Sequence, residues 1–271
     1  MTDRRLTPVN GRVAAMHLAG QVDAAKYVAG TDMMLGQPVT DLRASPAGAR
    51  DRQLLLGATA TVFEDLDGWS FVQAADGYVG YVPTDALVAP AVVTHFVASF
   101  ATHAYAAEDM KSPDTVHLPF GACLQVLDER RKFFETPLGF VPKKHLRPLD
   151  HPFTDPATVA QLHFGVPYLW GGNSTRGIDC SGLVAASLTG CGIACPADSD
   201  MQRDGLGVTA AGSPMRGDLV FWKGHVGMMV DEQTMIHANA HHMATVYEPL
   251  DKAIQRIQAQ GDGDVTARKR L

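Results

Sequence analysis

Cysteine is scarce in this sequence, with 4 residues among 271, and so low a content excludes a small scaffold held together by disulfides. Cys191 and Cys195 lie four residues apart, but no second Cys or His pair follows them at zinc-ligand spacing. His241 and His242 stand alone among small residues. We therefore predict buried thiols rather than a metal site, and no cofactor.

An excess of positive charge is also missing. The 23 basic and 29 acidic side chains give a net charge of -6, which provides no field for holding nucleic acid or an anionic bilayer. The chain has no uncharged apolar run of about 18 residues, the length needed to cross a membrane. Its first twenty residues lack the apolar core of a secretory signal. We expect a cytoplasmic protein that binds neither nucleic acid nor membrane.

The first half of the chain contains an internal repeat. Gly80-Tyr-Val-Pro83 recurs as Gly139-Phe-Val-Pro142, an offset of 59 residues (139 − 80). Around the first copy, short strands are predicted at residues 60–64, 69–73 and 78–82, separated by Asp-Gly turns. This pattern predicts two small β-barrels, which resemble bacterial SH3-like domains over residues 31–90 and 91–150. We interpret residues 1–30 as a docking arm with some helix.

The sequence pattern changes at residue 151, where the last predicted domain, residues 151–271, begins. Asp155-Pro156 is a helix start, and the run from Cys180 to Leu188 has apolar residues at helical spacing. Strands are predicted at residues 218–222, 225–230, 235–238 and 245–249. Helices packed on an antiparallel sheet make this an α+β domain.

Cys180 is the best nucleophile candidate, because it begins a predicted helix after an irregular segment. The positive end of a helix dipole lowers the pKa of a thiol from about 8.5 toward the range of reactive cysteines, provided that the site is partly open to solvent. The alternative interpretation of Cys180 is a small buried hydrophobic residue at a helix start.

A thiolate nucleophile needs a base that later protonates the leaving amine, and imidazole titrates near neutrality. His225 starts a predicted strand between Gly224 and Gly227, so its ring can project from a sheet edge. His237 follows twelve residues later, where a hairpin can place it beside His225 to fix the tautomer and orientation of that ring. Taken alone, each histidine would more often have a structural role, and the spacing of a Cys-His pair does not by itself identify a family.

Four motifs then occur in one order within residues 155–250: Tyr168 to Val184, Arg216 to Trp222, Gly224 to Gly227, and Ile236 to Asn239. Together they resemble the NlpC/p60 cysteine peptidases. The resemblance implies a papain-like fold with Cys180 as nucleophile, His225 as base and His237 as the third polar residue. It also implies cleavage of peptidoglycan stem peptides between γ-D-glutamate and the following diamino acid.

The repeats resemble the bacterial SH3-like domains that precede such catalytic domains. That subgroup takes released peptides with a free N-terminal L-alanine, so the resemblance implies an L-Ala-γ-D-Glu-diamino acid substrate and a role in cell-wall recycling. It assigns the ammonium to Asp179, a backbone contact to Ser181, a contact from the first barrel to Tyr78, and polarisation of the scissile carbonyl to Tyr168. From the residues alone, Asp179 also suits a helix N-cap, and Tyr168 also suits aromatic packing.

The segment from Pro196 to Gln202 resembles the family's Pro-Arg-Asp-Ser-Asp-x-Gln, in which the Asp and Ser contact the D-glutamyl unit. The corresponding residues are Asp198 and Ser199, which also fit a helix N-terminus. Ala197 replaces the usual Arg, and only Arg203 is near. Two other functions stay open: an exported hydrolase that remodels intact peptidoglycan, and a wall-binding protein without activity.

Overall fold

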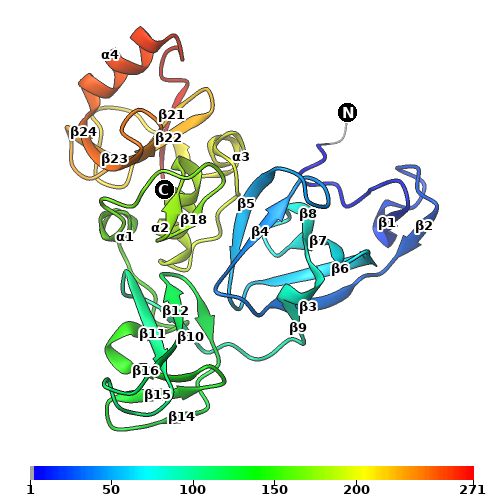
Figure 1. The fold of residues 1–271 in the computed structure, drawn as a ribbon. Coiled ribbons are helices and arrows are strands. Elements are labelled where there is room, and N and C mark those ends of the chain that lie inside the picture. Colours follow the sequence, from blue (N-terminus) through cyan, green and yellow to red (C-terminus); the bar gives the residue numbers. More distant parts are fainter. Residues whose placement is uncertain (1–2) are drawn as a thin grey trace. The chain divides into compact units, whose positions relative to one another are not determined.

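The structure is a computed structural model that describes residues 3–271. It divides into two units (Figure 1). The first runs to Val97 and includes Thr102–Leu118 and Ala122–Leu146, while the second comprises Ala98–Ala101, Pro119–Gly121 and Arg147–Leu271. None of the helices within residues 3–271 has the length and apolar character of a membrane span.

The N-terminal segment packs on the first half of the first unit. Strand β1 (Val13–Ala15) pairs in parallel with β2 (Lys26–Val28), and Val13 joins a buried cluster with Phe63 and Phe71. The only helix in residues 3–30 is the 3-10 turn η1 (Met16–Leu18). The predicted helix is thus reduced to one turn, since no apolar face recurs at helical spacing to stabilise a longer one.

The first predicted SH3-like domain forms one antiparallel sheet with the strand order β5-β4-β8-β7-β6-β3-β9. At Asp67 and Gly68 the backbone φ angles are both positive (52° and 79°), as a tight hairpin turn requires. Closure of this sheet into a barrel stays a prediction. The strands are β3 (Thr31–Leu35), β4 (Val39–Arg43), β5 (Arg50–Leu55), β6 (Thr59–Leu66), β7 (Trp69–Ala74), β8 (Val79–Pro83) and β9 (Leu87–Val88).

The second repeat shows the same succession of elements. Strand β8 leads through the 3-10 turn η2 (Thr84–Ala86) into β9, and β16 leads through η3 (Lys143–His145) into β17 in the same way. Its strands form sheets with the orders β13-β10-β17 and β12-β11-β16-β15-β14. They are β10 (His95–Val97), β11 (Ala101–Tyr105), β12 (Asp114–Pro119), β13 (Cys123–Leu124), β14 (Asp128–Glu129), β15 (Phe133–Thr136), β16 (Gly139–Pro142) and β17 (Leu146–Pro148).

The second unit is built on a six-stranded antiparallel sheet with the order β20-β25-β21-β22-β23-β24. The predicted helix start is present, because Asp155 caps α1 and Pro156 is its first residue. The elements are α1 (Pro156–Leu162), β18 (Asn173–Ser174), β19 (Gly177–Ile178), α2 (Cys180–Thr189), α3 (Ser199–Gly205), β20 (Val208–Thr209), β21 (Leu219–Trp222), β22 (His225–Met229), β23 (Thr234–Asn239), β24 (Ala244–Pro249), α4 (Leu250–Gln260) and β25 (Ala267–Arg270).

Helices cover both faces of this sheet (Figure 1). On one face, Leu183 and Leu188 of α2 are buried against Phe221 and Ile236. On the other face, α4 packs on alternate residues of the same strands, and Ile257 of α4 is 4% exposed. The sequence analysis placed helices on the sheet but did not identify α4, and this helix carries one wall of the site described next.

Candidate active site

Cys180 is the first residue of α2, and Asp179 is the N-cap residue of that helix. One carboxylate oxygen of Asp179 accepts hydrogen bonds from the Gly182 N–H (2.7 Å) and the Ser181 hydroxyl (3.0 Å), and the other accepts from the Gly171 N–H (2.9 Å). The N-cap alternative for Asp179 is therefore what the structure shows. The carboxylate anchors the turn before the helix and fixes where the thiol begins.

Gly182 has a steric reason to lack a side chain. A Cβ atom there would lie 2.3 Å from the carbonyl oxygen of Gly172, which is closer than any real Cβ contact. The Gly-Gly turn thus lies directly on the first turn of α2. This close packing holds the segment after Tyr168 against the residues that follow Cys180.

His225 and His237 lie on the same face of the hairpin formed by β22 and β23. Met228 pairs with Ile236, so continuing this register places Gly227 opposite His237 and His225 one diagonal step away. A Cβ atom at Gly227 would collide with the end of the Met235 side chain and lie 3.3 Å from His237 Cβ. His225 Nε2 lies 2.9 Å from His237 Nδ1, and the Nδ1 atom of His225 is left for another partner.

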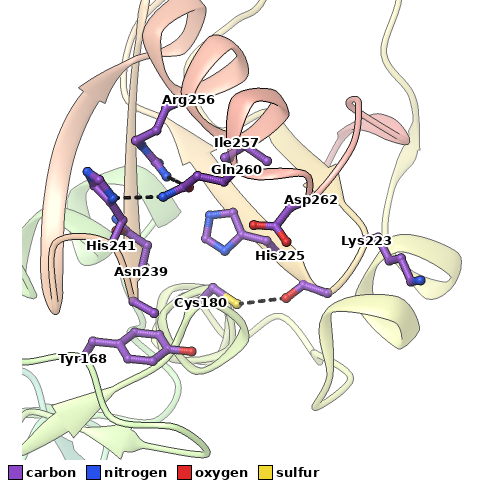
Figure 2. Close-up of a pocket in the computed structure, with 12 residues that line it drawn as sticks. Tyr168, Cys180, Lys223, His225, Asn239, His241, Arg256, Ile257, Gln260 and Asp262 are labelled. Atoms are coloured by element: carbon purple, nitrogen blue, oxygen red, sulfur yellow. Dashed lines mark hydrogen bonds between the residues drawn. The ribbon is translucent and has the colours of Figure 1, made fainter.

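The sulfur of Cys180 lies beside the start of β22. Its thiol donates a long hydrogen bond of 4.0 Å to the carbonyl oxygen of Gly224, and the backbone N–H of Val226 also hydrogen-bonds to the sulfur. The two residues that flank His225 therefore contact the thiol. Cys180 and His225 both line a pocket of about 590 Å³, in which Figure 2 shows the two side chains facing the same space.

The protonation states in the pocket differ from the sequence-based expectation for the thiol. Burial, with the negative charge of Asp179 in addition, raises the pKa of Cys180 to about 12, although backbone N–H groups around the sulfur act in the opposite direction. Burial and, to a smaller extent, the neighbouring His237 together lower the pKa of His225 to about 3. The expected low thiol pKa is wrong because it assumed a site partly open to solvent. At neutral pH the pair is a thiol and a neutral imidazole.

His237 is fully buried and is connected to a carboxylate that the sequence analysis missed. Its Nε2 atom lies 3.0 Å from Glu248, and Glu248 accepts two hydrogen bonds from Arg256, at 2.9 and 2.7 Å. Burial acts to raise the pKa of Glu248, but the hydrogen bonds from Arg256 and His237 outweigh it and leave that pKa well below its usual range. Glu248 is therefore ionised.

Two further predicted residues lie in or beside this pocket. Tyr168 lines the pocket, and Figure 2 shows its hydroxyl on the Cys180 side. Burial, together with the charges of Cys180 and Asp179, raises the pKa of that phenol. The Ser181 hydroxyl is engaged by Asp179, so a contact from Ser181 to substrate would require its backbone or a change of rotamer.

The remaining predicted residues are not among those that line this pocket. Asp198 is the N-cap residue of α3 but makes no cap hydrogen bond with its side chain, and its charge contributes to raising the pKa of Asp179. Ser199 begins α3 and is half-buried. Arg203, the nearest candidate to replace the missing Arg at position 197, is paired with Asp204 at 2.7 Å. Tyr78 belongs to the first unit, where it is 3% exposed and the guanidinium of Arg52 lies over its ring.

Within residues 3–271, one group of side chains has ligand atoms close enough to hold a metal ion. His237, His242 and Glu248 offer atoms within 4.8 Å of one another. However, the Arg256 guanidinium already lies 2.7 Å from the Glu248 oxygen that faces His237. A cation placed there would face this positive charge, so the donor set fits a hydrogen-bond network better than a metal ion.

Two family models match parts of this chain. The NlpC/P60 family matches residues 165–259, and the bacterial dipeptidyl-peptidase SH3 domain matches residues 42–87. A probable endopeptidase of Mycobacterium tuberculosis is 33% identical over 98 residues, which are 35% of this chain and 26% of that protein. A γ-D-glutamyl-L-lysine dipeptidyl-peptidase of Bacillus cereus is 33% identical over 106 residues, which are 36% of this chain and 32% of that protein.

A solved structure extends the likeness of fold to both units. The crystal structure of an NlpC/P60 family protein from Bacillus cereus has a TM-score of 0.74 and 20% sequence identity, and the match covers 89% of this chain and 99% of that one. The chain matches these two curated relatives over only about a quarter to a third of their own length. The chain therefore contains an NlpC/P60 domain, preceded by a bacterial dipeptidyl-peptidase SH3 domain.

Proposed function

We propose that this protein is a cysteine endopeptidase that cleaves the γ-D-glutamyl-diamino acid bond of peptidoglycan stem peptides with a free N-terminal L-alanine. The observation that carries the proposal is that Cys180 and His225 line one pocket, while the buried His237 hydrogen-bonds to the Nε2 atom of His225 behind it. The name of the Bacillus cereus relative supports the choice of bond. Recycling of released wall peptides in the cytoplasm is part of the same proposal.

The chemistry starts from a neutral pair. As the sulfur attacks the scissile carbonyl carbon, the proton of the Cys180 thiol passes to Nδ1 of His225, and an S–C bond forms. The N–H of Cys180, at the start of α2, is placed to donate to the resulting oxyanion. The imidazolium then protonates the leaving amine as the C–N bond breaks. Water hydrolyses the thioester, giving its proton to His225 and restoring the thiol.

Two carboxylates near the start of α2 support recognition of a free amine. Burial raises the pKa of Asp179, and the negative charge of Asp198 adds a smaller effect in the same direction, because the two carboxylates repel each other. An ammonium group bound beside them relieves this repulsion, whereas an acylated amine does not. This preference distinguishes released peptides, whose L-alanine is free, from stems still attached to glycan.

Mass spectrometry of the products tests the proposal directly. We expect the full chain to release L-Ala-γ-D-Glu from L-Ala-γ-D-Glu-diaminopimelate, and to leave the N-acetylated peptide intact. Cys180→Ala is the matched control, because it removes only the sulfur and should abolish cleavage while preserving the far-UV circular dichroism.

Each other outcome points away from the proposal. Equal cleavage of both peptides would favour an exported hydrolase that acts on intact wall. Binding of muropeptides without any cleavage would favour a wall-binding protein. Full activity of Cys180→Ala would show that the nucleophile is another residue.

A further inference from the structure

Glu248 continues the line of the two histidines across the sheet. His237 on β23 pairs with Val246 on β24, and Glu248 pairs with Met235, so Glu248 is one diagonal step from His237 on the same face. That face is the one covered by α4, which supplies Arg256. Three adjacent strands and one helix thus bring four polar side chains into a row that begins beside Cys180.

The hydrogen bonds along this row have only one consistent direction. Glu248 is an ionised carboxylate and only accepts, so the Nε2 atom of His237, 3.0 Å away, must carry the proton. The Nδ1 atom of a neutral His237 is then an acceptor, and it requires the proton of the contact at 2.9 Å to be on Nε2 of His225. Nδ1 of His225 is consequently unprotonated and able to accept the thiol proton.

Asn239 would impose the opposite direction if Glu248 were absent. Its amide nitrogen lies 3.1 Å from His237 Nε2, and its amide oxygen is fixed by the backbone N–H of His242 at 2.9 Å. An amide N–H that donates to Nε2 would move the His237 proton to Nδ1. The proton of His225 would then lie on Nδ1, the nitrogen that does not contact His237. The charged acceptor outcompetes the neutral donor because hydrogen bonds to ions are about twice as strong.

Arg256 makes this arrangement possible in a buried place. It binds both oxygens of Glu248, and the side chains of the pair are only 17% and 11% exposed. The positive charge also acts on the histidines, lowering the pKa of both His225 and His237, while Glu248 acts to raise them. The ion pair therefore orients the rings without adding a net charge that would protonate them.

We propose that Glu248, held by Arg256, is a positioning residue that fixes the tautomer of both histidines so that His225 presents an unprotonated nitrogen to Cys180. This inference rests on the proposed function for its kinetic consequence only. It gives α4 a part in the chemistry, because Arg256 of that helix holds the Glu248 carboxylate, which itself touches neither the substrate nor the sulfur.

The test compares Glu248→Gln with the unmodified chain and with a matched control. Asp218→Asn is the control, because Asp218 is 1% exposed and is held by Arg270 through two hydrogen bonds of 2.7 Å, yet it contacts neither histidine. Nitrogen-15 NMR of labelled histidines reports the tautomer of each ring without any substrate. Hydrolysis of L-Ala-γ-D-Glu-diaminopimelate gives kcat and KM.

We expect the proton on Nε2 of both His225 and His237 in the unmodified chain and in Asp218→Asn. In Glu248→Gln the His225 proton should move to Nδ1, and kcat should fall on the order of 100- to 10,000-fold with KM little changed, as for other catalytic histidines held in the wrong tautomer. A His225 proton on Nδ1 in the unmodified chain would overturn the inference even if Glu248→Gln does not fold. So would a folded Glu248→Gln that keeps the original tautomers or a kcat within threefold.

The NMR result stands apart from the proposed function. If the unmodified chain shows the expected tautomers and Glu248→Gln changes them, the role of Glu248 holds even where the tripeptide is not cleaved, and only the substrate is wrong. If the tripeptide is cleaved and the tautomers do not respond to Glu248→Gln, the proposed function holds and the role of Glu248 fails.

Discussion

Asp179 offers a sharp test of how the nucleophile is held in place. Replacing it with alanine removes the N-cap of α2, which typically costs about 0.5 to 2 kcal/mol. It also leaves the N–H of Gly171, a buried residue, without its acceptor, which costs about 1 to 3 kcal/mol more. The desolvation of the carboxylate, visible in its raised pKa, offsets part of this sum. We expect Asp179→Ala to lower the free energy of unfolding by about 2 to 4 kcal/mol.

Two further substitutions divide this loss. Asp179→Asn keeps an oxygen for the N–H of Gly182 but turns its amide toward the N–H of Gly171, so it should lose about 1 to 3 kcal/mol. Ser181→Ala removes only a hydroxyl that donates to the same carboxylate, and should lose less than about 1.5 kcal/mol. The hydrogen bonds alone therefore predict the largest loss of unfolding free energy for Asp179→Ala, a smaller loss for Asp179→Asn, and the smallest for Ser181→Ala.

Urea unfolding followed by tryptophan fluorescence can measure these losses. Of the three tryptophans, Trp69 lies in the first unit, and Trp170 and Trp222 lie in the second. A Trp69→Phe background therefore restricts the signal to the unit that contains Asp179, which avoids mixing two transitions. A loss of unfolding free energy below about 1 kcal/mol for Asp179→Ala, with an unchanged slope of that free energy against urea concentration, would refute the structural role of this carboxylate.

Three other predictions concern buried positions of the second unit. Gly182→Ala should lower the melting temperature measurably by calorimetry, because the added methyl meets the Gly172 carbonyl at 2.3 Å, and an unchanged melting temperature would contradict this packing. Gln202→Leu should lower the free energy of unfolding, measured in urea, by about 2 to 4 kcal/mol, because the Gln202 amide donates to the carbonyls of Ser181 (2.9 Å) and Pro196 (3.0 Å). A loss below about 1 kcal/mol would contradict this role of Gln202. His163 is 1% exposed, and burial lowers its pKa to about 4. On acidification the unfolded chain therefore binds this proton first, and the free energy of unfolding falls by about 3 kcal/mol between about pH 6.5 and 4. His163→Phe should remove this part of the pH dependence, and an equal pH dependence in both chains would show that His163 does not titrate as described.

Local patterns predicted much of the catalytic unit. The N-cap residue Asp155 with Pro156, and the apolar spacing after Cys180, predicted the starts of α1 and α2. These features depend on neighbours along the chain, which a sequence displays directly. A hairpin was likewise expected to place His237 beside His225, and Nε2 of His225 does lie 2.9 Å from Nδ1 of His237.

What the sequence could not reveal depends on packing between distant segments. Glu248 and Arg256 carry no motif, and they meet the histidines only because α4 folds back on the sheet. An amphipathic pattern from Leu250 to Gln260 was available as a signal for that helix. The pKa of Cys180 was mispredicted for the same reason, because a helix terminus is visible in sequence whereas the loss of solvent around a sulfur is not.

The hairpin that carries both imidazoles limits how the chain can change in length. Side chains alternate between the two sides of a strand, so adding or deleting a single residue between His225 and His237 would turn one ring toward α2 and leave the other beneath α4. Changes of two residues in the turn at 230–233 keep both rings on one side. Natural variation in this turn should therefore come in even steps.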